Sequence, residues 1–191
     1  MARIAVRTVD RDGRPIVRSS GVQADLSGIL ENAPALHDGL SAFSRALRDH
    51  RTLPARLVEL VRLRIAFHNQ CRSCMAIRYQ VAIDDGLDEG LVCSLERPYE
   101  APDLSAAETV ALHYADLFAT DHLAIDDAVY DGLREYFTES QIVELGLNCA
   151  LCVGVGRLAA TWDVVDQLPE RFQARGDEPV TPWGSGAVTV L

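Results

Sequence analysis

The sequence predicts an all-α domain, and three observations predict it. Apolar residues recur at helical spacing in the first half, as at Leu57, Val61 and Ile65. Two segments, Ser105–Glu108 and Thr138–Gln141, match the capping box that opens a helix. No alternating apolar and polar run of strand length precedes the polar C-terminal tail. We therefore expect helices almost throughout.

The expected elements follow in order. Pro54 suits a first helical turn, and the helix it opens ends at the polar break His68-Asn69-Gln70. A second helix is predicted from Cys71 to Asp85-Gly86, where Gly86 fits a C-terminal cap. Residues 95–104 form a loop with two prolines, after which helices start at Ser105, near Asp126 and at Thr138.

The chain divides into three parts by composition. Residues 1–22 are polar and aperiodic and are predicted to be an N-terminal arm, residues 23–168 the helical domain, and residues 169–191 a C-terminal tail. With 191 residues the chain suits one domain, because this length can bury a core without disulfide staples.

Charge and composition exclude several functions. The net charge of −10 opposes binding to nucleic acid or to an anionic membrane. All 18 basic residues are arginine, so Schiff-base chemistry on lysine is excluded. The N-terminus lacks the apolar stretch of a secretory signal, and the longest uncharged apolar run, 145–156, is too short to span a bilayer. An odd number of cysteines, five, then favours a reducing compartment, and we expect a cytoplasmic protein.

Cys71-Arg-Ser-Cys74 is the most informative motif. Two cysteines three positions apart share one face of a helix and can form a disulfide. A helix start lowers the pKa of a thiol, and the thiolate is the species that attacks peroxides and disulfides. The motif therefore predicts a redox dithiol, the alternative being two small buried apolar residues.

The other cysteines carry weaker signals. Cys149 and Cys152 lie in an apolar run, where buried cysteines are common and unreactive. The alternative joins both pairs into a four-cysteine zinc site, although 75 residues separate them and the segment around Cys149 lacks the polar residues of a zinc knuckle. Cys93 is interpreted as a packing residue.

Glu59 lies twelve residues before Cys71, on the preceding helix. A break at Asn69 could fold this helix back over the thiols, where the carboxylate could accept a proton through a water. The alternative is an ordinary i, i+3 ion pair with Arg62.

Glu59, Asn69, Cys71 and Cys74 in this spacing resemble the core motif of AhpD-like alkylhydroperoxidases of the carboxymuconolactone decarboxylase superfamily, and the resemblance extends over residues 26–166. It implies an AhpD-like helical fold and an obligate homo-oligomer, a trimer or hexamer. It also implies a peroxidase, with Cys74 attacking the hydroperoxide, Cys71 resolving the sulfenic acid as a disulfide, and Glu59 in the proton relay. No metal or organic cofactor is implied, only an external dithiol or thioredoxin-like reductant.

One position departs from the family pattern, since Arg78 stands where the family has a histidine. On a regular helix residue 78 would face the thiols, but arginine cannot shuttle protons. His68 is the first candidate to replace the shuttle, with His113 and His122 as weaker ones, whereas Tyr79 is interpreted as packing.

Three functions are therefore carried forward. The first is thiol-dependent reduction of hydroperoxides through Cys71 and Cys74. The second is a decarboxylase of the muconolactone type, whose relatives share the fold without depending on the cysteine pair. The third is a redox sensor or oligomeric scaffold with weak turnover, which the departure at Arg78 favours.

Overall fold

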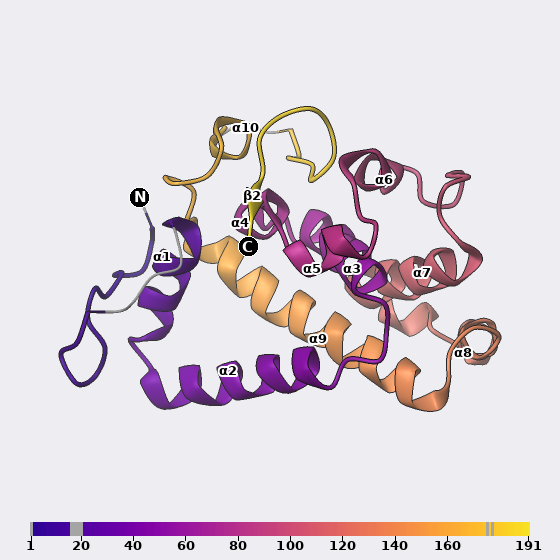
Figure 1. The fold of residues 1–191 in the computed structure, drawn as a ribbon, viewed down its shortest axis with the longest axis horizontal. Helices are drawn as coiled ribbons and strands as arrows, with labels where there is room; N and C mark the ends of the chain where they lie inside the picture. The colour runs from indigo at the N-terminus through magenta and orange to yellow at the C-terminus, as the bar shows by residue number, and fades with distance from the viewer. Residues whose placement is uncertain (1, 16–20, 175, 177) are drawn as a thin grey trace.

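The computed structural model describes residues 2–15, 21–174, 176 and 178–191, and it is mostly helical (Figure 1). Residues 1 and 16–20 of the predicted arm lie outside this range. The elements, in chain order, are α1 (Gly21–Leu30), α2 (Pro34–Asp49), α3 (Ala55–His68), α4 (Arg72–Ala76), β1 (Ile77–Arg78), α5 (Gln80–Asp84), α6 (Glu89–Ser94), α7 (Ala106–Thr120), the 3-10 helix His122–Ala124, α8 (Asp127–Arg134), α9 (Glu139–Trp162), α10 (Glu170–Gln173) and β2 (Thr189–Val190).

Helix α3 is the centre of the main core. It packs chiefly against α7 and α9, and the long helix α9 runs diagonally across the molecule beside it (Figure 1). The predicted stripe of Leu57, Val61 and Ile65 is almost completely buried there. Helix α2 lies along one side of the molecule, and none of its residues is buried.

The predicted capping boxes are both confirmed. The Ser105 hydroxyl accepts from the backbone of Glu108, whose carboxylate accepts from the Ser105 backbone. Thr138 and Gln141 make the same exchange at the start of α9. Each pair satisfies amides that the first turn of a helix leaves without partners.

Gly86 also behaves as predicted, although it ends a shorter helix. It has a φ of 88°, a conformation in which only glycine lacks a steric penalty. Its N–H donates to the backbone oxygen of Ile83, and the N–H of Leu87 donates to that of Ala82. These are the two hydrogen bonds of a Schellman motif, here at the end of α5.

The single helix predicted from Cys71 to Gly86 is wrong. Helix α4 ends at Ala76, and the next two residues form β1, which pairs in parallel with β2 in the C-terminal tail. The Leu191 amide donates to the backbone oxygen of Arg78, and the Gln80 amide donates to the backbone oxygen of Leu191. The backbone hydrogen bonds between the two segments thus continue past β1 and β2 to Gln80 and Leu191. A pairing partner more than 100 residues away thus interrupts the helix.

The tail packs on the segment that carries the cysteine motif. The Gln70 side chain exchanges two hydrogen bonds with the backbone of Val180, and the Trp183 ring lies 4.7 Å from that of Phe67. Phe172 is fully buried in a second, smaller core with Met75 and Ile77.

Helix α9 is the one described helix that is long and apolar enough to cross a bilayer by length and composition. The core helix of a soluble protein passes the same test. One side of α9 is buried in the core, through residues that include Leu145, Cys149 and Ala159. Val143, Leu147 and Leu158 of the same helix are exposed.

Candidate active site

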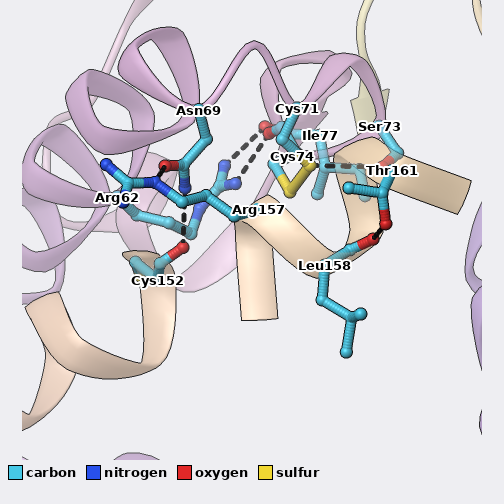
Figure 2. The surroundings of a disulfide bond; sticks show 10 residues. All are labelled: Arg62, Asn69, Cys71, Ser73, Cys74, Ile77, Cys152, Arg157, Leu158 and Thr161. Carbon is cyan, nitrogen blue, oxygen red and sulfur yellow. Dashed lines mark hydrogen bonds between the residues drawn. A yellow bond between two sulfur atoms is a disulfide. The ribbon is translucent and has the colours of Figure 1, made fainter. Parts of the chain in front are cut away.

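The cysteine motif lies at a sharp turn between α3 and α4. Helix α3 ends at His68, Asn69 caps it, and Gln70 takes a φ of 50° before the chain enters α4 at Cys71. Cys71 and Cys74 form a disulfide with their Cα atoms 5.2 Å apart (Figure 2). Cys71 is completely buried, whereas Cys74 is partly exposed. Of the two sulfur atoms, Cys74 therefore offers the approach from outside.

Two neighbouring cavities adjoin this turn. One, of about 170 Å³, is lined by Cys74 together with residues of α1, α3 and α9. The other, of about 240 Å³, is lined by Glu59 and extends to the C-terminal end of α2. The two cavities share four lining residues: Arg62, Tyr79, Leu151 and Cys152.

Arg62 joins Glu59 to the cysteine turn. Its guanidinium donates to both carboxylate oxygens of Glu59, at 2.6 and 2.7 Å, so the ion pair expected as the alternative role of Glu59 is present. It also donates to the backbone oxygens of Cys74, at 2.7 Å, and Ile77, at 2.8 Å (Figure 2). Burial lowers the pKa of Arg62, but the charge and the hydrogen bonds of Glu59, with smaller contributions from Tyr79 and Cys152, together outweigh burial, and the net shift is upward. Arg62 is therefore a permanent cation beside Cys74.

Asn69 fastens the same turn to α9. Its side-chain amide donates to the backbone oxygen of Cys152 at 2.9 Å and accepts from Nε of Arg157 at 3.0 Å (Figure 2). Gly156 makes room for it, because a Cβ there would lie 2.6 Å from the Asn69 amide nitrogen. The spacing of Asn69 before the motif thus has a structural basis.

The expectation that Arg78 faces the thiols is wrong. That expectation required a regular helix through residue 78, but α4 ends at Ala76. The Arg78 side chain is turned into the protein, with 1% of its surface exposed. Its guanidinium donates to the carboxylate of Glu89 and to three backbone oxygens, those of Met75, Ile77 and Pro182. Arg78 ties α4, α6 and the tail together and does not line the cavity of Cys74.

His68 does not replace the missing histidine at the thiols. Its Nε2 lies 2.6 Å from a carboxylate oxygen of Asp116 on α7, which also accepts from Arg64 and from the Tyr99 hydroxyl. Burial opposes ionisation of Asp116, but these hydrogen bonds outweigh it and lower its pKa to about 2.

The two weaker histidine candidates also lie elsewhere. His113 and His122 are exposed, and neither lines either cavity. Tyr79, in contrast, lines both cavities, and the Arg62 guanidinium lies 5.2 Å from the centre of its ring. Tyr79 therefore forms part of the cavity walls and is more than the packing residue that the sequence suggested.

The remaining cysteines divide three ways. Cys149 is buried in the core, where burial raises the pKa of its thiol, as predicted. Cys152 lines both cavities, and burial, opposed by the charge of Arg62, raises its pKa to about 11. Cys93 is exposed, so its interpretation as a packing residue is wrong. Within the described ranges no group of three or more potential ligands is placed to hold a metal ion, which gives the zinc alternative no support.

Sequence reasoning missed Cys152 and the link from Arg62 to Cys74. A signal for the first exists, because Asn148, Leu151 and Cys152 fall at i, i+3 and i+4 on one face of α9. The second joins a side chain to a backbone oxygen twelve residues on, for which the sequence holds no pattern.

Comparison with known proteins places this geometry in context. Residues 34–117 match the carboxymuconolactone decarboxylase family. Two curated relatives, uncharacterised proteins from the CDC 1551 and H37Rv strains of Mycobacterium tuberculosis, are each 36% identical over 139 residues, which are 70% of this chain. The chain spans about half the length of these relatives, 48%.

Two solved structures are similar in fold. One is a protein of unknown function from Agrobacterium tumefaciens, described as a candidate antioxidant defence protein AhpD (TM-score 0.61, 19% identity, 70% of this chain and 91% of that one). The other is an uncharacterised peroxidase-related protein from Ralstonia eutropha JMP134 with an alkylhydroperoxidase AhpD core (TM-score 0.62, 18% identity, 80% and 81%).

Proposed function

We propose that this chain is a thiol-dependent peroxidase of the carboxymuconolactone decarboxylase superfamily that acts through Cys71 and Cys74. Residues 34–117 match that family, and the fold is similar to those of two AhpD-like structures. The observation that carries the proposal is the unequal exposure of the paired sulfurs. Cys74 opens to a cavity, and Cys71 is sealed behind it at bonding distance. A peroxidatic thiol must meet substrate, whereas a resolving thiol need only meet its partner.

The chemistry balances with no metal and no organic cofactor. The Cys74 thiolate attacks the terminal oxygen of a hydroperoxide, the O–O bond breaks, and the alkoxide takes up the proton the thiol gave up, leaving an alcohol and a sulfenic acid. The Cys71 thiol then displaces water from this sulfenic acid and forms the disulfide. An external dithiol attacks the disulfide at the accessible Cys74 and completes its own oxidation, which returns both thiols.

Arg62 supplies the fixed positive charge that favours a thiolate at Cys74. Glu59 holds Arg62 with both carboxylate oxygens, so we assign it a positioning role, and we route the proton through water in the cavity beside Cys74. In this proposal Glu59 therefore acts through Arg62 and does not itself carry the proton, unlike the proton-relay role expected from the sequence.

The proposed reaction needs a reductant, and we propose that the protein meets it in the cytoplasm as an oligomer. The reductant is a dithiol or thioredoxin-like protein in the cytoplasm, and the protein works as a homo-oligomer, a trimer or hexamer. Exposed apolar side chains on α2 and α9, namely Leu36, Phe43, Val143 and Leu147, support self-association.

Steady-state reduction of cumene hydroperoxide with dihydrolipoamide as reductant tests the proposal. Cys74→Ser and Cys71→Ser should each reduce the rate at least a hundredfold, and Cys93→Ser should leave it unchanged, because Cys93 lines neither cavity. Equal rates in wild type and Cys74→Ser would contradict the peroxidase. Disulfide formation without turnover would favour the redox sensor, and lactone decarboxylation independent of both cysteines would favour the decarboxylase.

A further inference from the structure

The larger cavity has the form of an amphiphile site. Its walls come from α2, α3 and α9, and apolar side chains such as Leu47, Val58 and Leu151 line it. It continues past Arg62, Tyr79, Leu151 and Cys152 into the cavity where Cys74 lies. A ligand that lies along this path contacts apolar surface between the end of α2 and the reactive sulfur.

Two arginines stand at the end of this path farthest from Cys74. Arg48 and Arg51 line the larger cavity and are absent from the wall of the smaller one. The Arg51 side chain is partly buried and makes no hydrogen bond or ion pair with a described residue. Arg48, whose side chain is exposed, has among the described residues only a 3.9 Å contact with the exposed Asp49. Both guanidinium groups are therefore free to take an anion.

The one acidic side chain in the cavity wall does not oppose such an anion. Glu59 is neutralised by Arg62 through two hydrogen bonds. In a chain with a net charge of −10, the cavity is thus a local site of positive charge.

We infer that the cavity binds a hydroperoxide with an apolar chain and a terminal carboxylate, of the long-chain fatty-acid class, with the carboxylate on Arg51 and Arg48. The inference rests on the proposed function and specifies its substrate. Guanidinium and carboxylate form paired charge-assisted hydrogen bonds. The chain follows the apolar wall past Leu151, and a hydroperoxide partway along it reaches Cys74. There the O–O bond breaks, the hydroxy fatty acid leaves, and Cys74 becomes the sulfenic acid that Cys71 reduces.

Binding can be measured without turnover. Oleate, and methyl oleate as its neutral counterpart, would be titrated against the oxidised protein by displacement of a fluorescent fatty acid. Oleate should bind about tenfold more tightly than the ester, as expected for a charge-assisted pair. Arg51→Gln should remove that difference. Arg45→Gln should preserve it, because Arg45, on α2, is exposed and lines neither cavity.

Kinetics separate this inference from the proposed function. The hydroperoxide of linoleate should show a KM about tenfold below that of its methyl ester, with the advantage lost in Arg51→Gln and kept in Arg45→Gln. Reduction of both substrates with equal KM would overturn the inference and leave the peroxidase standing. Selective oleate binding without any hydroperoxide reduction would overturn the peroxidase and leave the ligand class standing. Absence of oleate binding, including the case where a second copy of the chain covers the cavity, would overturn the inference.

Discussion

The guanidinium of Arg62 donates a hydrogen bond to the backbone oxygen of Cys74 at 2.7 Å. The same group is held by Glu59, so a side chain on α3 fixes both the position and the electrostatics of the partly exposed cysteine on α4. The turn between these helices is closed a second time by Asn69, which reaches α9. The reactive cysteine is thus set in a frame of three helices.

Replacement of Glu59 by glutamine should disturb this frame. The buried Arg62 would lose its counterion, which we expect to lower the free energy of unfolding by about 3 kcal/mol. Thiol reactivity at Cys74 should fall while the pH profile of peroxidase activity keeps its shape, because Glu59 acts through Arg62. Urea unfolding and the pH dependence of kcat/KM would measure the two effects. Loss of the acidic limb in Glu59→Gln would instead assign Glu59 to the proton relay.

Arg78→His tests whether the family histidine can simply be restored. From the sequence alone, histidine at this position should supply the proton shuttle and raise the rate at least tenfold. The structure predicts no gain, since residue 78 is buried away from the cavity of Cys74. Loss of the bonds to Glu89 and three carbonyls should cost about 3 kcal/mol and lower Tm by about 10 °C.

The exposed Arg97, changed to histidine, is the matched control for that variant and should leave Tm within about 2 °C of wild type. A folded Arg78→His protein with faster turnover would contradict the assignment of Arg78 as a structural residue.

Two glycines of α9 give opposite predictions for the same change. Alanine at Gly156 would place a methyl group 2.6 Å from the Asn69 amide, displacing it from Cys152, and should destabilise the protein by about 2 kcal/mol. Alanine at the exposed Gly154 meets nothing within 4 Å and should stabilise the helix by up to about 1 kcal/mol. Thermal unfolding of both variants would check this, and equal effects would contradict the role given to Asn69.

Cys152 should make stability fall at alkaline pH. Its pKa in the folded protein is raised to about 11, mainly by burial, so its contribution is complete below its unfolded value near 8.5 and is lost as pH rises toward 11. Between pH 8 and 10.5 wild type should lose about 2 kcal/mol more than Cys152→Ala does. Urea unfolding at the two pH values measures the difference. An identical loss in both proteins would show that Cys152 is not held in its neutral form.

Local signals in the sequence predicted much of the fold. The capping boxes, the end of α3 and the turn at Gly86 depend on residues within a few positions of one another, and all appear as predicted. The end of α4 could not be predicted in this way. It depends on the pairing of Ile77 with Thr189, far along the chain.

In the candidate site, too, local features were predicted from the sequence and long-range contacts were not. The cysteine pair and the ion pair of Glu59 with Arg62 are local patterns, and both were found. The expectation that His68 lies at the thiols was wrong, because its partner, Asp116, lies 48 residues away on α7. The expectation that Arg78 faces the thiols was wrong because the helix that it required ends at Ala76.

The most direct test of peroxidase chemistry at Cys71 and Cys74 is mass spectrometry after thiol alkylation, on reduced protein with and without one equivalent of cumene hydroperoxide. Two alkylatable thiols should disappear and the peptide map should join Cys71 to Cys74, while Cys93 remains free. Two thiols that stay free, or an overoxidised Cys74 without the disulfide, would contradict a two-cysteine peroxidase.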